Sequence, residues 1–281
     1  MNPNNEPLVT IITVVYNSVF LLEETILSVI NQTYQNIEYI IIDGASNDGT
    51  IDIIKKYEDK ISLWISEPDK GIYDAMNKGI DLANGAWINF MNAGDKFFNE
   101  SIVESIFKTN NYEQYDIIYG NYEYINSIGL SIYKKARNLG GMWKFMPFCH
   151  QTLFMKINVI KEYYFNINNF AADHELIYKC YNRKLEFLKL DLIIATYLSG
   201  GVSERRGLES GKSRWQHVKN ITPLVRVDLY YLYMLHVQQI RFLLRKYLPD
   251  PIKNVIIRLK NYNNTVPKYK GGSDSDFFVR K

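Results

Sequence analysis

Apolar and polar residues alternate along the first third of the chain in blocks that predict two kinds of element. Short apolar runs rich in β-branched and aromatic residues predict buried strands at 8–16, 37–43, 61–66 and 86–91. Apolar residues recur at helical spacing in 20–31, in a segment ending at Tyr57 and in 72–83. Strands separated by helices predict βαβ units, and therefore a parallel sheet with right-handed crossovers.

The regular alternation fades after Asp95. The pattern then predicts a helix over 101–108, antiparallel strands within 117–135, a short helix over 173–182, a strand over 185–190 and a helical segment over 214–248. We therefore expect an α/β domain over 1–205, with halves at about 7–100 and about 100–205. A helical extension over 206–265 and a flexible tail over 266–281 would follow it.

Charge separates the C-terminal part from the rest. Residues 205–281 hold 16 Lys and Arg against 5 Asp and Glu, a net charge of +11, whereas the other residues hold 17 against 25, a net charge of −8. The basic part is therefore expected to meet an anionic partner. Apolar residues share one helical face there (Ile252, Val255, Ile256 and Leu259), which favours an anionic membrane surface. No nucleic-acid motif accompanies the charge, so we expect no nucleic-acid partner.

The composition of the chain indicates the cellular compartment in which the protein is expected. Hydrophobic residues make up 47% and charged residues 22% of the chain, as is usual for a soluble globular protein. Cys149 and Cys180 have neither metal-ligand nor disulfide spacing, which favours a reducing compartment. We see no signal-peptide pattern and no apolar run of transmembrane length. We therefore expect a cytoplasmic protein, peripheral on the inner face of the plasma membrane if its basic part binds lipid.

Polar residues follow each of the four predicted strands, in 13–18, 43–50, 67–79 and 92–95. In an open α/β sheet the carboxyl ends of the strands meet at one edge, where ligands bind. These loops offer carboxylates for a base and ribose hydroxyls, and an aromatic ring for stacking. Asp95 adds a carboxylate that suits a divalent cation held against a diphosphate. The combination favours a nucleotide diphosphate as ligand.

Each loop also has a purely structural explanation. Asp43-Gly44 is a common turn dipeptide, Asn47 to Thr50 suit a helix cap, and Asp95 alone suits a solvated turn. Ligand binding is favoured because such residues recur after successive strands. The first strand lacks a Gly-x-Gly-x-x-Gly motif, and the chain lacks a P-loop. We therefore expect a cation on Asp95 to neutralise the diphosphate.

Five motifs narrow the function: TVVYN at 13–17, IIDGASNDGT at 41–50, DKGIYDAMNKG at 69–79, ANG at 83–85 and NAGD at 92–95. Together they resemble the family 2 glycosyltransferases of the GT-A fold, over about residues 7–205. The resemblance implies a Rossmann-like α/β fold, with a mostly parallel sheet, helices on both faces and here a C-terminal helical extension. It also implies inverting transfer of a hexosyl or N-acetylhexosaminyl group from a nucleotide-diphosphate sugar, usually UDP-linked, with Mg²⁺ or Mn²⁺.

Carried over position by position, the resemblance implies roles for individual residues. Asp95 matches the last carboxylate of the family's DXD motif and would hold the metal. Asn92 departs from that motif, where an aspartate is frequent, and it contributes no charge to the metal. The nucleotide-sugar site would comprise Thr13, Tyr16, Asn17, Asp43, Asp74, Asn77, Asn92, Ala93 and Gly94.

The resemblance also implies an aspartate general base downstream, and the motif favours Asp173. His174 and Glu175 are rivals, and the segment also reads as an ordinary helix start with acidic first-turn residues. A carboxylate base would take the proton of the acceptor hydroxyl, a contribution of about 10²–10⁴ in rate. His150 and Gln151 resemble a pair near the acceptor site in relatives, and Arg205 and Arg206 suit contact with a diphosphate.

The sequence thus predicts a transferase that builds a bacterial-type polysaccharide on a glycan or lipid-linked glycan acceptor. A second copy of the chain is a further candidate partner. Two competing functions stay open. A nucleotidyltransferase would use a similar sheet but release pyrophosphate, and a catalytically degenerate glycan-binding module would be consistent with Asn92.

Overall fold

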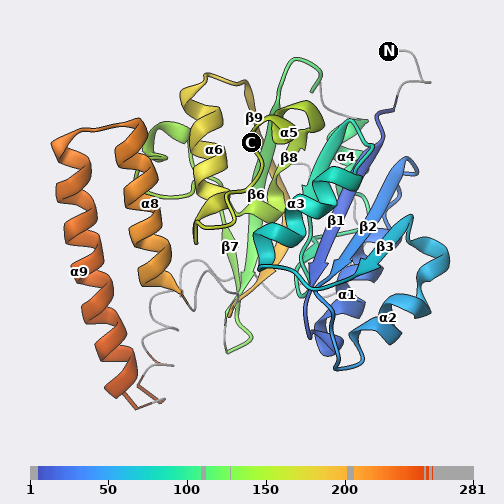
Figure 1. The fold of residues 1–281 in the computed structure, drawn as a ribbon, viewed down its shortest axis with the longest axis horizontal. Helices are drawn as coiled ribbons and strands as arrows, with labels where there is room; N and C mark the ends of the chain where they lie inside the picture. Colours follow the sequence, from blue (N-terminus) through green and yellow to red (C-terminus); the bar gives the residue numbers. More distant parts are fainter. Residues whose placement is uncertain are drawn as a thin grey trace.

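The computed structural model describes residues 6–108, 112–126, 128–200 and 206–249, together with 251, 252 and 255. For residues 241, 242 and 244–246 it describes the backbone alone. Over these residues nine strands form one sheet in the order β3-β2-β1-β4-β8-β6-β9-β5, with β7 paired to β6. Figure 1 shows helices on both faces of the sheet and two further helices, α8 and α9, at the end opposite β3.

The first half consists of the predicted βαβ units. Its elements are β1 (Val9–Val15), α1 (Val19–Ile30), β2 (Ile37–Asp43), α2 (Thr50–Lys56), η1 (Glu58–Lys60), β3 (Leu63–Ser66), α3 (Ile72–Leu82) and β4 (Trp87–Phe90). β1 pairs in parallel with both β2 and β4, and β2 with β3. All four strand predictions are therefore confirmed, and their carboxyl ends lie at one edge.

The second half is more irregular. It contains β5 (Lys96–Phe97), α4 (Ile102–Phe107), β6 (Ile117–Ile125), β7 (Ser131–Lys134), η2 (Leu139–Gly141), η3 (His150–Thr152), β8 (Phe154–Lys156), α5 (Ile157–Tyr163), α6 (Ala172–Asn182) and β9 (Phe187–Leu198). The predicted antiparallel pair within 117–135 is confirmed as β6 with β7. The strand expected over 185–190 is longer and ends at Leu198.

The expectation of a mostly parallel sheet needs correction, because the sheet is mixed. Among the described residues, four strand pairs are parallel and four are antiparallel. The change occurs at β4, whose second neighbour β8 runs antiparallel, with Asn89 opposite Phe154. The turn η3 lies beside the end of β4, so the chain enters β8 from that edge and runs back. This arrangement brings His150 to the edge where the strand-end loops lie.

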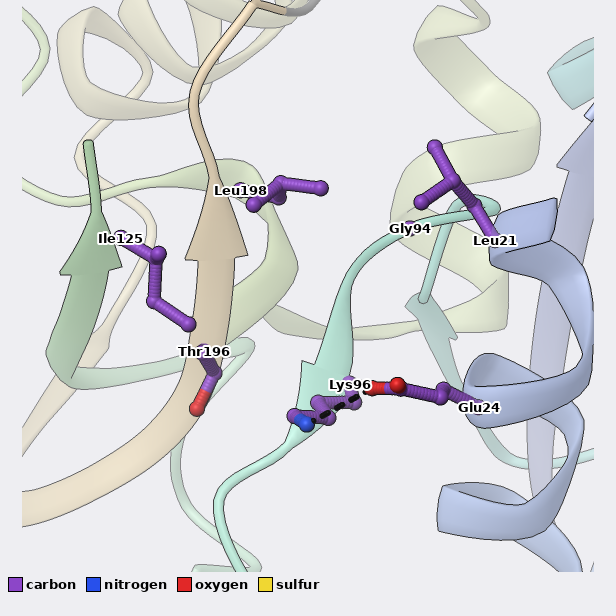
Figure 2. Close-up of a pocket in the computed structure, with 7 residues that line it drawn as sticks. All are labelled: Leu21, Glu24, Gly94, Lys96, Ile125, Thr196 and Leu198. Carbon is purple, nitrogen blue, oxygen red and sulfur yellow. Dashed lines mark hydrogen bonds and ion pairs between the residues drawn. The ribbon is translucent and has the colours of Figure 1, made fainter. Parts of the chain in front are cut away.

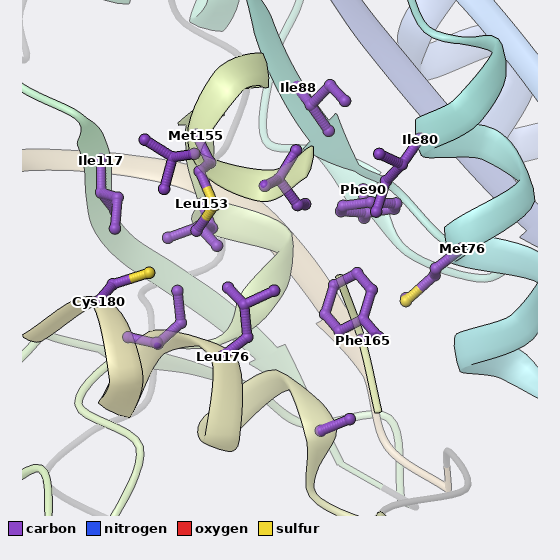
Figure 3. Packing of buried hydrophobic residues seen from close by; sticks show 14 of the residues in the cluster. Met76, Ile80, Ile88, Phe90, Ile117, Leu153, Met155, Phe165, Leu176 and Cys180 are labelled. Carbon is purple, nitrogen blue, oxygen red and sulfur yellow. The ribbon is translucent and has the colours of Figure 1, made fainter. Parts of the chain in front are cut away.

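Alternation along the strands supplies a core on each face. Ile12 and Val14 of β1 belong to one apolar cluster with residues of α3, α5 and α6, which Figure 3 shows between β4, β8 and α6. Val9 and Ile11 point the other way, into a cluster with α1, α2 and α4. Two buried faces explain why these strands read as continuous apolar runs.

The C-terminal extension forms two helices, α8 (Gly207–Ile221) and α9 (Val225–Tyr247), rather than the single helical segment expected over 214–248. The break falls at Pro223, where proline interrupts helical hydrogen bonding. Val218, Val227 and Tyr231 are buried in the cluster that includes α6. Among the described helices, none has the length and apolarity needed to cross a membrane. The predicted tail 266–281 and most of 250–265 lie outside the described residues.

Candidate functional site

Tyr16 and Asn17 follow β1 and open the edge at which the parallel strands end. The Tyr16 side chain is 63% exposed. Asn17 adopts a left-handed φ of 45°, and its amide oxygen accepts a 3.0 Å hydrogen bond from the backbone N–H of Asn47. Its own N–H donates to Ser46 Oγ at 2.8 Å. These bonds tie the loops after β1 and β2 together and leave the Tyr16 ring facing solvent.

Asp43, at the end of β2, is fully buried. One carboxylate oxygen accepts the hydroxyl hydrogen of Ser46, and the other accepts bonds from Ser46 N–H at 3.0 Å and Ser66 Oγ at 2.6 Å. Next to it, Gly44 leaves room for Asp69, since a Cβ on Gly44 would lie 2.6 Å from Asp69 Oδ2 and 3.3 Å from the Tyr16 ring. A partly exposed carboxylate thus lies beside the exposed ring.

Three other predicted residues have well-defined partners inside the protein. Thr13 is buried and donates to Met91 O at 2.7 Å, which fixes the end of β4 against β1. Asn77 pairs with Phe165 at both ends of its amide, each bond 2.9 Å long. Asp74 accepts a 2.9 Å bond from Lys70 N–H at the start of α3. These contacts anchor the loops; whether any of the three residues also touches a ligand stays a prediction.

Residues 92–95 form the turn that follows β4. Ala93 N–H donates to Val14 O, and Asp95 N–H closes the turn on Asn92 O at 2.9 Å. Gly94 has a φ of +98°, a conformation that glycine adopts without strain. The turn is therefore hydrogen-bonded to the end of β1, and the side chains of Asn92 and Asp95 are buried.

Asp95 is a buried carboxylate with two neutral donors. Gln151 Nε2 donates to one oxygen at 2.6 Å, and the backbone N–H of Leu198 donates to the other at 3.2 Å. Burial raises the pKa of Asp95 to about 7, although both hydrogen bonds oppose that shift. None of the ion pairs among the described residues involves Asp95.

A divalent cation fits this carboxylate. A buried charge without a positive partner is costly, and a bound cation would remove that cost. The buried amide oxygen of Asn92 in the same turn also has no hydrogen-bond partner. Within the described part of the chain no group of three or more His, Cys, Asp and Glu side chains could hold a metal. The site thus resembles those in which one or two protein carboxylates bind Mg²⁺ and phosphate oxygens and water complete the shell.

Asp173 meets two residues from distant parts of the chain. Tyr73 of α3 donates its hydroxyl hydrogen to Oδ1 at 3.2 Å, and His150 Nδ1 lies 3.8 Å from Oδ2. The Tyr73 ring stacks on Phe165 at 5.5 Å between centroids, and Phe165 packs edge-on against Phe90 of β4 at 5.3 Å. Burial and the neighbouring Asp173 raise the pKa of Tyr73, which keeps it a hydrogen-bond donor.

The rival bases His174 and Glu175 face away from this group. His174 is buried, donates Nε2–H to Met142 O at 2.8 Å, and faces His217 of α8 with Nδ1 at 2.7 Å. Glu175 binds the Lys179 ammonium at 2.8 Å and accepts the Asn169 amide. Of the three candidates, Asp173 is the one beside Tyr73 and His150.

The residues predicted for the acceptor or the diphosphate also differ in their position relative to Asp173 and Asp95. His150 faces the turn at 92–95 as well as Asp173, because its Nε2 lies 3.0 Å from Asn92 Nδ2. Burial lowers the pKa of His150, against the opposing effect of Asp173. Gln151 binds Asp95, as described above. The Arg206 guanidinium lies over the Phe170 ring at 5.1 Å, close in sequence to Asp173. Arg205 lies outside the described residues.

A cavity of about 170 Å³ opens on the other side of this turn (Figure 2). Its wall is mainly apolar, with Leu21, Ile125 and Leu198, and an ion pair between Lys96 and Glu24 closes one side at 2.9 Å. Of the predicted site residues, Gly94 alone lines it. The cavity therefore borders the Asp95 turn but does not contain the group around Asp173.

The sequence did not single out Tyr73 and Asp69, which the structure adds as candidate site residues. Both belong to the motif at 69–79, whose roles fell instead on Asp74 and Asn77. Tyr73 precedes Asp74 in α3, so helical geometry turns its side chain about 100° away, toward α6. The motif marked the segment, but the face of α3 that meets Asp173 depends on how the helix packs.

The sequence profile described as Glycosyl transferase family 2 matches residues 10–174, more than half of the chain. The chain belongs to glycosyltransferase family 2. The matched range contains the strand-end loops and both members of the His150–Asp173 contact. The family expected from the five motifs is thereby confirmed.

Relatives known from sequence point the same way. The chain is 40% identical over 98 residues to an uncharacterized glycosyltransferase of Mycobacterium tuberculosis, a match that covers 34% of this chain and 37% of that protein. It is 26% identical over 213 residues to a PGL/p-HBAD biosynthesis glycosyltransferase of Mycobacterium bovis, covering 70% and 79%. The matched segment thus spans little more than a third of the first relative.

Solved structures share the fold. The S. aureus TarS fragment 1–349 in complex with UDP-GlcNAc superposes with a TM-score of 0.60 at 18% identity, over 75% of this chain and 66% of that one. The mannosyltransferase PcManGT of Pyrobaculum calidifontis, in complex with GDP-Man and Mn²⁺, gives 0.61 at 14% identity, over 92% and 81%. The expected GT-A-like fold with C-terminal helices is therefore confirmed, with the mixed sheet described above.

Proposed function

We propose that this family 2 member is an inverting glycosyltransferase that moves a hexosyl or N-acetylhexosaminyl group from a nucleotide-diphosphate sugar to a hydroxyl group. The observation that carries the proposal is the convergence of Tyr73, His150 and Asp173 beside the turn at 92–95. Four separate segments supply these groups, and the family's transfer reaction needs a carboxylate base near a diphosphate site.

The donor would lie along the strand-end edge. Tyr16 would stack on the base, and Asn17 and Asp69 would offer hydrogen-bond partners to the base or ribose. Buried Thr13 and Asp43, with Asn77, would hold these loops in place. Asp74, Ala93 and Gly94 would line the path toward the sugar, and Asn92 would offer its unpartnered amide oxygen to a hydroxyl. The TarS fragment was solved with UDP-GlcNAc, which supports a UDP-sugar as the donor class.

A cation, Mg²⁺ or Mn²⁺, would bind Asp95. When bound, it would neutralise the charge of the departing diphosphate. Gln151 and the Leu198 N–H would hold the carboxylate from the protein side. The Mn²⁺ in the PcManGT complex supports this assignment.

Asp173 would act as the general base. As the acceptor oxygen bonds to the anomeric carbon, the hydroxyl proton passes to Asp173 Oδ2, and the bond between that carbon and the diphosphate breaks. The sugar leaves its donor with inverted configuration, and the nucleoside diphosphate departs. Oδ1 is held by Tyr73 and by the N–H of His174 at 2.8 Å, so Oδ2 is the oxygen presented to the acceptor.

The acceptor proposal is a glycan or lipid-linked glycan, in bacterial-type polysaccharide synthesis, on the inner face of the plasma membrane. Its support is a row of large apolar side chains, each 45–74% exposed, on one face of α9: Val225, Leu229, Leu232, Tyr233, Ile240, Leu243 and Tyr247. Residues 206–249 hold eight Lys and Arg against two Asp and Glu. An apolar helix face on a basic element suits an anionic membrane surface. Arg206, directly before α8, would approach the diphosphate, and the sequence predicts the same contact for Arg205.

Turnover of a panel of nucleotide sugars, with Mn²⁺ or with a chelator, tests the function. We expect release of a nucleoside diphosphate from one UDP-sugar, lost on chelation and with Asp95→Asn. Asp173→Asn should lower kcat by about 10²–10⁴ with little change in donor binding. Asp59→Asn, at an exposed carboxylate, is the control. Release of pyrophosphate from a nucleoside triphosphate and a sugar phosphate, without turnover of any nucleotide sugar, would indicate a nucleotidyltransferase. Sugar binding without turnover would indicate a glycan-binding module.

A further inference from the structure

His150 connects the turn after β4 with the proposed base. Its Nε2 lies 3.0 Å from Asn92 Nδ2, and its Nδ1 lies 3.8 Å from Asp173 Oδ2. The ring belongs to η3, between Cys149 and Gln151, and Gln151 holds Asp95. The imidazole therefore stands between the sugar side of the site and the carboxylate that would take the proton.

The partners of the ring determine where its hydrogen lies. The Asn92 amide nitrogen is a donor with no lone pair to offer, so the facing Nε2 must be the acceptor. A neutral imidazole with an acceptor at Nε2 carries its hydrogen on Nδ1. That N–H is on the nitrogen that lies 3.8 Å from Asp173 Oδ2. A distance of 3.8 Å is too long for a hydrogen bond, but it lets the positive end of the N–H attract the carboxylate.

The opposite tautomer would be unfavourable here. With hydrogen on Nε2, the Asn92 amide would have to turn over to present its oxygen, and the Nδ1 lone pair would face the Asp173 carboxylate. An aspartate at position 92 would impose this state, because a carboxylate only accepts hydrogen bonds. The family's frequent aspartate at this position is thus incompatible with the His150 tautomer, and Asn92 is compatible with it.

Building on the function proposed above, the geometry assigns Asn92 and His150 a joint role: Asn92 fixes His150 as the Nδ1–H tautomer, and His150 positions Asp173. The other side of the carboxylate is already held, since Tyr73 and the His174 N–H donate to Oδ1. The His150 N–H attracts Oδ2, which has a second lone pair for the acceptor hydroxyl. Asn92, in place of the family's frequent aspartate, therefore offers no negative charge to the metal but fixes the His150 tautomer that positions Asp173.

The tautomer can be observed without turnover. We expect a two-bond ¹H–¹⁵N spectrum of ¹⁵N-histidine-labelled protein at about pH 8, above the usual imidazole pKa, to show His150 with hydrogen on Nδ1. Loss of its signals in His150→Asn assigns them among the chain's four histidines. His174 donates from Nε2 to Met142 O, so it serves as an internal reference for the other tautomer. Hydrogen on Nε2 of His150 in the unaltered protein would overturn the proposal.

A double-mutant cycle tests the link to catalysis. Asn92→Asp should move the His150 hydrogen to Nε2 and lower kcat about tenfold with a smaller change in donor KM, although it restores the family's frequent carboxylate. In a His150→Asn background, whose amide still donates from the δ position, the same change should cost less than about twofold. Equal losses in both backgrounds would show that Asn92 does not act through His150. If no sugar is transferred at all, the proposed function fails, while the spectrum still decides the tautomer.

Discussion

Tyr73 and Asp173 are 100 positions apart in the sequence, and their hydrogen bond is what singles out Asp173 among the acidic residues of its segment. The phenol is held by stacking on Phe165, whose backbone the Asn77 amide binds from the same helix. A fixed ring restricts its hydroxyl group to a narrow range of directions. The proposed base is therefore oriented by α3 as much as by its own helix, α6.

Replacement of Tyr73 by phenylalanine should lower kcat about threefold to tenfold and leave donor KM nearly unchanged, because one of the two donors to Asp173 Oδ1 is lost. Steady-state kinetics with the donor found in the panel measures both constants. Tyr164→Phe is the matched control, since Tyr164 makes a 2.6 Å bond to Asp81 away from the site. Equal effects of the two substitutions would contradict a specific role for Tyr73.

At the scale of elements, α6 and α8 are joined by a chain of neutral hydrogen bonds. Asn169 Nδ2 lies 3.2 Å from His217 Nδ1, His217 Nε2 lies 2.7 Å from His174 Nδ1, and His174 Nε2 donates to Met142 O. Each ring accepts at one nitrogen and donates at the other. Burial lowers the pKa of His174 well below its ordinary value and that of His217 to about 4.

These shifts predict acid lability. Below about pH 6.5 the two histidines are protonated in the unfolded chain but stay neutral in the folded protein. The free energy of unfolding should therefore fall from pH 6.5 toward pH 4, by about 3 kcal/mol for His217. The stabilisation is fully present above pH 6.5. Urea unfolding across this range measures it. His217→Gln keeps a donor for His174 but cannot titrate, so its slope should be smaller, whereas exposed His236→Asn should match the unaltered protein.

Helix α3 packs tightly against Ile12 of β1 at Gly79. A Cβ there would lie 2.6 Å from Ile12 Cγ2, a branched side chain within the sheet. Gly79→Ala gains about 1 kcal/mol of helix propensity but overpacks the core by about 1–3 kcal/mol. We expect a net loss, seen as a Tm lower by a few degrees. Gly207→Ala at the start of α8, where a Cβ meets nothing within 4 Å, should not lower Tm.

For the whole molecule, α9 has one face packed and one face open. Val227 and Tyr231 are buried, whereas the row of seven apolar residues defined above is exposed. Asp228, the one acidic residue of α9, turns to α8 and binds Trp215 Nε1 at 2.7 Å and Lys219 at 3.1 Å. Two copies paired through this face would bring their basic helices together, which disfavours a dimer and favours an anionic membrane.

Flotation with vesicles tests this at the scale of the whole protein. We expect the full chain to bind vesicles rich in phosphatidylglycerol, more weakly at high salt, and Leu229→Ser with Leu232→Ser and Leu243→Ser to reduce binding at least about tenfold. Leu63→Ser with Ile167→Ser, at exposed apolar positions elsewhere, is the control. A dimer in solution that the α9 variant dissociates, without vesicle binding, would assign the face to a second copy.

Much of the fold follows from local patterns. The period of apolar residues predicted β1 to β4 and their helices to within a few residues, because strand and helix periodicity depend on neighbours in sequence. Pro223 explains the one helix predicted too long. Pairing of β8 with β4 was not predictable in the same way, since it depends on where η3 places the chain.

The candidate site divides along the same line. Residue types and spacing predicted the strand-end edge and the turn at 92–95, and the motifs indicated the family, whose resemblance in turn implies the segment of the proposed base. Tertiary structure decided the partners of these side chains: Asp43 and Asn77 bind groups within the protein, and Tyr73, His150 and Asp173 face one another. The physical reason is the distance along the sequence over which each kind of interaction acts. Backbone periodicity acts over a few residues, whereas the partner of a side chain is set by the packing of whole helices on the sheet.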